Sequence, residues 1–281
     1  MLFAEPYYIV GPGDPNCEQE GAYPAVDRRT GDVYVAWEFN WVSNISVGAC
    51  ASPATPIHNV LARIPGSCLS SGPPLPTTTC PDQTTTSIPV VSMDVAFIPG
   101  YNRFPMNDFP RIAVSELAGT VSVVWNDARS NPGGDILLQT FNLGASLKPI
   151  GLAPVKINND HVIGTFHFLP ALRNADSLGR ISISWYDRRG NPNSALTDVY
   201  AAVAISPRIT NTPPNQRVTD TASDWLSVSS DAVPNFGDYT DNYASPTPTS
   251  PTDGDPLFVA WTDGRLNDPQ PFESHAPLPG R

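Results

Sequence analysis

The chain has 281 residues, of which 40% are hydrophobic, and a formal net charge of −11 at pH 7, which argues against a nucleic-acid partner. No stretch approaches the roughly 20 apolar residues of a membrane span, and the Met1-Leu-Phe start is not a secretion leader, so a secreted protein would carry its leader outside this sequence or have lost it. With 32 Pro and 20 Gly, the composition indicates a loop-rich chain with little helix.

A lone strand is predicted at residues 6–10, closed by Gly11-Pro-Gly13. A first repeat follows, with strands at 23–26, 31–37 and 59–63 and a last one at 88–91. Two irregular segments, residues 42–57 and 66–87, interrupt this repeat, and we interpret them as surface insertions.

All four cysteines lie in the first third of the chain, at Cys17, Cys50, Cys68 and Cys80. An even count without Cys-x-x-Cys spacing favours disulfides and an oxidising compartment over a metal or redox site. Three pairings are open, and proximity favours Cys68 with Cys80 and Cys17 with Cys50. Four unpaired thiols in a reducing cell are the alternative.

Later repeats share one phrase, a β-branched or aromatic run that ends in Trp and closes with Asp-x-Arg. It occurs at residues 121–129, 181–189 and 257–265, and in degenerate form at 33–38. The second repeat predicts strands at 109–114, 119–125, 135–141 and 153–157, and the third predicts strands at 168–172, 179–185, 198–204 and 216–218. The fourth opens at 236–239, reaches its Trp strand, and contains only half of its strands.

This pattern predicts an all-β fold, a β-propeller of four-stranded antiparallel blades forming a single domain over residues 1–281. Sixty residues separate Trp125 from Trp185, and 76 separate Trp185 from Trp261, so about four to six blades are expected. The strand at 6–10 could complete the last blade, or the chain could be a fragment of a longer one. A β-sandwich is the alternative architecture, although it gives no reason for the repeated Trp.

The Tyr-Pro, Phe-Pro and Leu-Pro openings, the Val-x-Trp-x-Asp-x-Arg endings and Phe236-Gly-Asp-Tyr239 together resemble the sialidase-like β-propellers of secreted bacterial proteins. The resemblance covers most of residues 20–265 and implies the fold. Sialidases use three arginines, a Tyr nucleophile with a Glu partner, and an Asp. The nearest match to their first arginine is Phe109-Pro-Arg111-Ile, with the order changed, and no intact Asp-box is present, so catalysis is not carried over.

In a propeller, the turn after each Trp strand opens on the face where the first strands begin. One rim is therefore predicted to gather acidic, arginine and tyrosine side chains that could bind a glycan, with the three strand-ending aspartates as candidate Ca²⁺ ligands. The preferred interpretation is structural, because an Asp at a strand end caps its turn and can pair with the Arg two residues later. The rim residues are Asp127, Arg129, Asp187, Arg189, Asp263, Arg265, Asp238, Tyr239 and Asp241.

Other polar candidates are weaker. His58, His161, His167 and His275 lack metal-ligand spacing, and His161 with His167 is interpreted as a loop pair. Glu116 and Asp127 would need a separation of about 5–9 Å to act as glycosidase carboxylates. The Trp residues of the repeat are expected in the packing between blades, which leaves Trp41 and Trp225 as the candidates for exposed stacking.

Two functions follow. The first is a non-catalytic extracellular or cell-surface propeller that acts in glycan binding, adhesion or assembly with another extracellular protein, without any cofactor beyond Ca²⁺. The second is a diverged, sialidase-like secreted glycoside hydrolase. The missing catalytic signatures favour the first.

Overall fold

The structure is a computed structural model. It describes residues 19–39, 58–69, 80, 82–91, 93, 98–101, 109–174, 179–204, 209–228, 240–244 and 256–277. Cys17, Cys50, Trp41, Asp238, Tyr239 and the strands predicted at 6–10 and 236–239 lie outside these residues, as does the insertion at 42–57.

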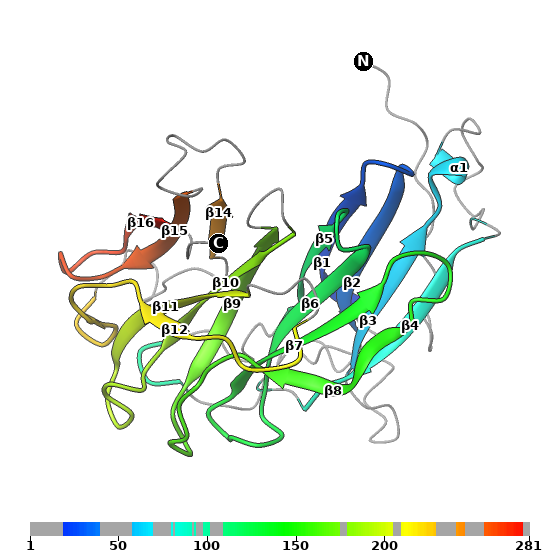
Figure 1. The fold of residues 1–281 in the computed structure, drawn as a ribbon. Helices are drawn as coiled ribbons and strands as arrows, with labels where there is room; N and C mark the ends of the chain where they lie inside the picture. Colours follow the sequence, from blue (N-terminus) through cyan, green and yellow to red (C-terminus); the bar gives the residue numbers. More distant parts are fainter. Residues whose placement is uncertain are drawn as a thin grey trace.

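Four antiparallel sheets follow one another along the chain, and we call them blades 1 to 4 (Figure 1). Blade 1 contains β1 (Gln19–Asp27), β2 (Asp32–Phe39), β3 (His58–Ile64) and β4 (Thr84–Pro89). Blade 2 contains β5 (Arg111–Ser115), β6 (Thr120–Asp127), β7 (Asp135–Asn142) and β8 (Pro149–Lys156). Both sheets are meanders in which each strand pairs with the next.

Blade 3 contains β9 (His167–Asn174), β10 (Ile181–Asp187), β11 (Leu196–Ala204) and the short β12 (Asn215–Arg217). A two-residue strand, β13 (Ser223–Asp224), also pairs with the start of β11. Blade 4 contains β14 (Asp241–Ala244), β15 (Pro256–Asp263) and β16 (Gln270–Pro277). The one helix in the described part of the chain is α1 (Gly66–Leu69), so the fold is all-β, and no described helix could cross a membrane.

The four repeated tryptophans occupy one structural position, the second strand of each blade, as the sequence predicted. Each Trp pairs with an apolar or aromatic residue of the third strand, and these partners are equivalent from blade to blade. The pairs are Trp37 with Val60, Trp125 with Leu137, Trp185 with Tyr200 and Trp261 with Phe272.

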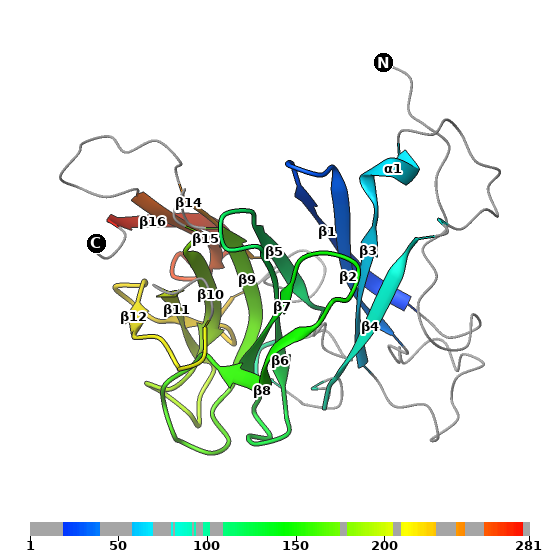
Figure 2. The same cartoon turned by 45° about the vertical axis from the view of Figure 1, so that its right-hand side comes forward.

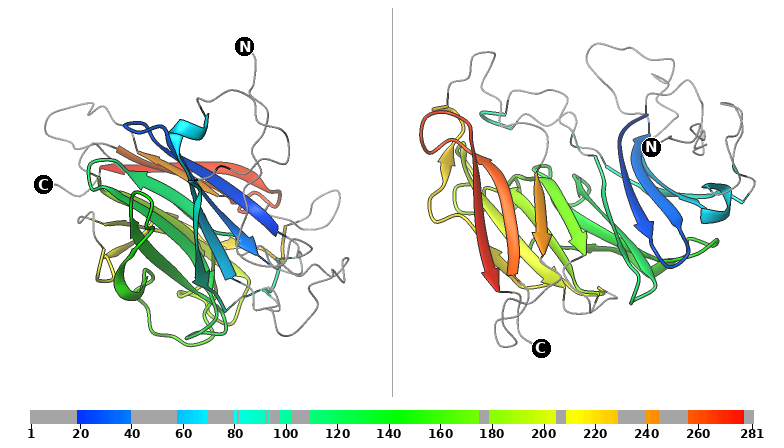
Figure 3. Two further views of the ribbon diagram at one scale, coloured as in Figure 1. Left: turned by 90° about the vertical axis from the view of Figure 1, so that its right-hand side faces the viewer. Right: turned by 90° about the horizontal axis from the view of Figure 1, so that it is seen from above.

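The blades lie side by side (Figure 2), and the view from above shows that they follow an arc (Figure 3, right). First strands of successive blades contact each other, β1 with β5, β5 with β9 and β9 with β14, so they form the inner side of the arc. Three apolar clusters fill the spaces between blades, and each contains one of the repeated Trp side chains. This is the packing expected of a β-propeller, in which single sheets bury their faces against their neighbours.

A disulfide between Cys68 and Cys80 closes the other face of blade 1. Both cysteines are buried in a cluster with Val35, Trp37 and Phe39, on the side of the sheet that faces away from blade 2. This pairing confirms the favoured prediction for these two residues. The disulfide itself therefore packs on an apolar face that no neighbouring described blade covers.

The sequence prediction was wrong about the third strand of the last blade. Blade 4 was expected to contain half of its strands, but β16 pairs along the whole of β15. Pro271 and Pro277 disguise this strand, since proline is depleted in sheet interiors. β4 also starts at Thr84 rather than at residue 88, inside the segment expected to be an insertion.

Candidate functional site

The Trp-x-Asp-x-Arg phrase forms a closed hydrogen-bonded unit in blades 2, 3 and 4. In blade 2, the indole Nε1 of Trp125 donates to Asp127 Oδ2 at 2.9 Å, and the backbone N–H of Arg129 donates to Asp127 Oδ1 at 2.9 Å. The guanidinium of Arg129 completes the unit with two further bonds to the same carboxylate. The same contacts recur around Asp187 and around Asp263.

The carboxylates of Asp127, Asp187 and Asp263 are completely buried. Burial alone would raise the pKa of Asp127, but the hydrogen bonds from Arg129, Trp125 and the backbone outweigh it and hold the pKa below its ordinary value. The same balance lowers the pKa of Asp263. A carboxylate whose lone pairs are occupied in this way is a structural group rather than a free ligand.

The arginine of each unit also reaches the segment that leaves the preceding blade. Arg129 Nη2 donates to the carbonyl oxygen of Pro89 at 2.6 Å, and Arg189 Nη1 donates to Asn159 Oδ1 at 2.6 Å. Arg265 donates to Asp220 Oδ1 at 2.5 Å and to the carbonyl oxygen of Thr221. The repeated phrase therefore ties each blade to the one before it.

Blade 1 provides the acceptor for its Trp indole N–H in a different way. Its degenerate copy has no Asp after Trp37, and the indole Nε1 instead donates to Gln19 Oε1 on the adjacent strand at 2.9 Å. The buried indole N–H thus has an acceptor in all four blades. The four sequence copies alone did not show that each Trp has such an acceptor.

His167 was interpreted as part of a loop pair, but it is the first residue of β9 and is completely buried. Its Nδ1 lies 2.7 Å from the carbonyl oxygen of Gly134, and its Nε2 lies 3.0 Å from Asp160 Oδ1. Burial of Asp160 would raise its pKa, but the contacts with His167, Asn158 and Arg189 lower it below the ordinary value. This cluster fixes the connection between blades 2 and 3.

Trp225 was expected to be exposed for stacking, but it is completely buried. It packs edge-on against Phe168 and Tyr186, and the guanidinium of Arg188 lies 5.5 Å from its ring. Arg188 is itself fully enclosed, and burial lowers its pKa to about 10. Polar residues flank Trp225 in the sequence, so the local pattern does not indicate this aromatic core between blades 3 and 4.

Two further sequence candidates are placed by the structure. Glu116 accepts hydrogen bonds from Arg28 in the β1–β2 turn, whereas Asp127 stands at the far end of β6, so these carboxylates cannot act as a pair. No group of three or more His, Cys, Asp or Glu in the described ranges is arranged to hold a metal ion. Ligand binding by the rim, including Ca²⁺ at Asp127, Asp187 and Asp263, stays a prediction.

A different set of polar side chains gathers on the inner first strands. The guanidinium of Arg111 on β5 lies 4.4 Å from the ring centre of Tyr23 on β1. Arg173 on β9 forms two hydrogen bonds with Asp241 on β14, at 2.6 and 3.0 Å. The hydrogen bonds that Arg173 donates to Asp241 raise the pKa of the guanidinium. Because β5 contacts both β1 and β9, the two pairs of residues lie on adjacent strands. We call Tyr23, Arg111, Arg173 and Asp241 the inner-strand cluster.

Three of these four residues occupy equivalent positions along the first strands of their blades. Tyr23 pairs with Ala36, Arg111 with Val124 and Asp241 with Ala260, and each partner directly precedes the repeated Trp. The positions of the repeated Trp residues could therefore have identified three members of the cluster. Arg173 lies two residues beyond the equivalent position, Ala171, and nothing in the sequence singles it out.

The inner-strand cluster offers both charges to solvent. Arg173 has 38% of its side chain exposed and Asp241 has 50%, whereas Arg111, a third charged member of the cluster, is buried. Arginines that present paired N–H groups suit carboxylates and hydroxyl-rich ligands.

Comparison with known proteins supports the fold. No protein-family model matches the chain, and no curated protein is similar to it in sequence. A Hadza microbial sialidase is similar in structure, with a TM-score of 0.50 and 10% identity over 92% of this chain and 46% of that one. The fold is thus a β-propeller, similar to the fold of this sialidase.

An N-acetylgalactosamine deacetylase from F. plautii, in complex with blood group B trisaccharide, aligns with a TM-score of 0.46 and 10% identity, over 90% of this chain. The present chain spans 64% of the length of the deacetylase and 46% of that of the sialidase.

Proposed function

We propose that this protein is a non-catalytic, extracellular or cell-surface β-propeller that binds glycans through its inner-strand cluster. The observation that carries the proposal is that two contact pairs, Tyr23 with Arg111 and Arg173 with Asp241, lie on adjacent first strands at the inner side of the arc. Guanidinium and carboxylate groups on rigid strands can make oriented hydrogen bonds to sugar hydroxyl and carboxylate groups.

Two observations support binding without hydrolysis. Glycoside hydrolysis needs two carboxyl groups about 5–10 Å apart, one of them able to donate a proton. Asp241 is instead held by two bonds from Arg173, and Glu116 is held by Arg28 in a turn. The similar sialidase acts on glycans, and a glycan ligand for this chain is inferred by that likeness of fold.

An extracellular location is supported by the Cys68–Cys80 disulfide, because such bonds persist in oxidising compartments.

The alternative is a diverged, sialidase-like glycoside hydrolase. It is favoured by one observation, the position of Arg111 within Phe109-Pro-Arg111-Ile at the start of an inner strand. Hydrolysis of a fluorogenic sialoside or arabinoside by the wild-type protein would establish this alternative and refute the non-catalytic proposal.

A glycan array tests the binding proposal directly. Wild-type protein should bind a restricted set of glycans, and Arg173→Ala should lose that binding at unchanged melting temperature, since this side chain is partly exposed. Arg28→Ala is the matched control, because Arg28 is also an exposed arginine paired with a carboxylate but lies in the β1–β2 turn. Equal binding by both variants would refute the assignment of the site.

A further inference from the structure

β16 is a third strand for which the described residues provide no fourth, and we call its outer edge the free edge. The third strands of the other blades, β3, β7 and β11, each pair along both edges, the outer one with β4, β8 or β12. β16 pairs with β15 alone among the described residues. Its side chains alternate between half-buried and exposed, whereas β7 is buried along nearly its whole length.

The positions of the prolines in β16 show which backbone groups face its free edge. Pro271 and Pro277 pair with Thr262 and Pro256, and a proline fits such a strand only where its nitrogen faces away from the partner. Alternate residues point their backbone groups the same way, so Glu273 and His275 present N–H groups to the free edge. The edge thus offers two donors, bounded at each end by a proline that cannot donate.

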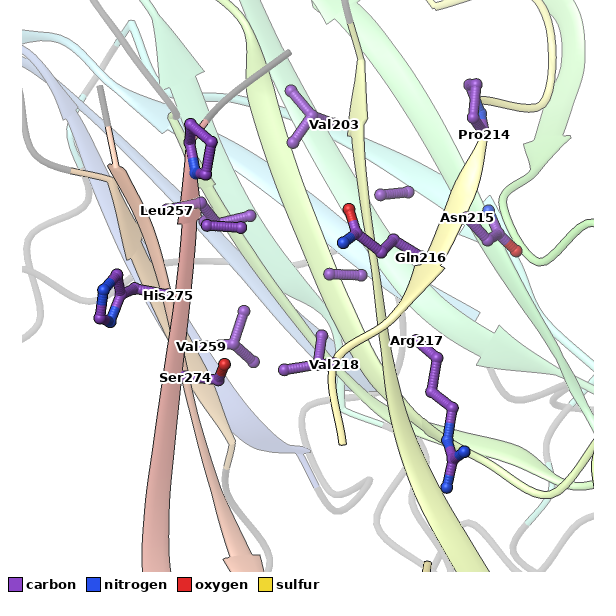
Figure 4. A pocket seen from close by; sticks show the side chains of 14 residues that line it. Val203, Pro214, Asn215, Gln216, Arg217, Val218, Leu257, Val259, Ser274 and His275 are labelled. Carbon is purple, nitrogen blue, oxygen red and sulfur yellow. The ribbon is translucent and has the colours of Figure 1, made fainter. Parts of the chain in front are cut away.

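A cavity of about 630 Å³ lies beside this edge, between blades 3 and 4 (Figure 4). Val203 and Val218 form one wall and Leu257 and Val259 the other, with Ser274 and Ala276 of β16 at the border. Between blades 2 and 3, the equivalent outer region is filled, with Val155 of the fourth strand β8 and the adjoining Ile157 in the core. The cavity therefore lies where side chains of a fourth strand would pack.

We propose that the edge of β16 and this cavity take one short extended segment of a partner polypeptide, added as the fourth strand of blade 4. An extended segment satisfies the two free N–H groups and places alternate apolar side chains in the cavity at once. A small apolar ligand would fill the cavity but leave both donors without a protein partner. The two prolines limit the paired stretch to residues 272–276, so the segment is about five residues long.

This surface lies on the third strand and outer half of the blades, whereas the inner-strand cluster lies on first strands. The proposal is thus independent of glycan binding. A Glu273→Pro variant tests it, because the new proline would remove one donor from the free edge and no hydrogen bond to β15. Glu273→Ala is the matched control, since it removes the same side chain and keeps the N–H.

The probe is a fluorescent heptapeptide of alternating valine and threonine with a lysine at each end, compared with a scrambled peptide of equal composition. Wild-type protein and Glu273→Ala should bind the alternating peptide alike, and Glu273→Pro should bind it about tenfold more weakly, the effect of one lost hydrogen bond. Equal binding by the proline and alanine variants, or equal binding of both peptides, would overturn the proposal.

Amide hydrogen exchange on the wild-type protein gives a second test that needs no variant to fold. Addition of the alternating peptide should slow exchange at Glu273 and His275 and leave Ser274, which is bonded to β15, nearly unchanged. Uniform slowing, or none, would contradict strand addition. Sedimentation of the protein alone provides the last check, since a dimer that Glu273→Pro abolishes would show that a second copy occupies the edge and would overturn a separate partner.

Discussion

A carboxylate at the buried end of a strand is stable only when every lone pair has a donor. Asp127 meets this condition with the indole of Trp125, the backbone and side chain of Arg129, and the backbone N–H of Val91 on the segment from blade 1. The Trp, the Asp and the Arg are thus one unit, and each requires the other two. This mutual requirement gives a structural reason for the recurrence of the phrase.

Asp127→Ala should therefore lower the free energy of unfolding by at least about 2 kcal/mol, because it leaves the indole N–H of Trp125 without its acceptor and the guanidinium of Arg129 without its carboxylate partner. Asp220→Ala is the control. Asp220 also bonds a motif arginine, but its side chain is 81% exposed, and its removal should leave the urea midpoint unchanged. Equal effects of the two substitutions in urea denaturation would contradict the structural role of the unit.

The same carboxylates set a pH dependence. The pKa values of Asp127 and Asp263 are lower in the folded protein than the roughly 3.9 expected in the unfolded chain. Their stabilisation is complete above the unfolded value and is lost as the pH falls through the folded values. Stability measured by urea should thus decline from about pH 5 downwards, and Asp127→Asn should make that decline shallower; an unchanged slope would speak against ionised carboxylates.

At the scale of single elements, the irregular strand β1 has the largest effect on the packing of blade 1 against blade 2. The pairing of β1 with β2 shifts between Glu20 and Tyr23, and Gly21 within this shift has a φ of +68°. A β-carbon at Gly21 would overlap the ring of Phe109, which precedes β5. Only glycine lets the two blades approach this closely and brings Tyr23 toward Arg111.

Gly21→Ala should destabilise the protein by about 2–4 kcal/mol, the sum of left-handed strain and overpacking. Gly119→Ala is the control, because its φ of +66° is nearly the same but nothing lies within 4 Å of the added carbon. That variant should lose only about 1–2 kcal/mol by thermal or chemical denaturation. A larger loss at Gly119 than at Gly21 would contradict the close approach.

Elements with a strong local signal were predictable from sequence. The four Trp strands and their common position follow from a period-2 pattern that ends at one residue type. β16 was missed because prolines at its free edge hide the alternation, and Trp225 was misplaced because its burial depends on Phe168 and Tyr186, which are distant in sequence. The arginine ties between blades join residues 30 to 45 positions apart, and no local pattern encodes them.

On the scale of the whole molecule, an arc of blades has two ends, and the two differ. The Cys68–Cys80 disulfide packs on the outer face of blade 1, where Trp37 and Phe39 are buried. Blade 4 leaves Tyr243 58% exposed and presents a free edge on β16. In a stack held by contacts between neighbours, local stability follows the number of covered faces.

Amide exchange should therefore rank the third strands of the blades. β7 lies within blade 2, paired on both edges and packed between blades 1 and 3, and its amides should exchange only when the protein unfolds globally. β16 should exchange through local opening, because one edge is free and the cavity removes packing from the face toward blade 3. β3 provides the decisive comparison, since it too belongs to an end blade but packs in one cluster with Cys68 and Cys80. Protection of β3 near that of β7, with β16 far below both, would follow from the packing of the disulfide on blade 1. Equal exchange in β3 and β16 would instead show that position at the end of the arc alone controls stability.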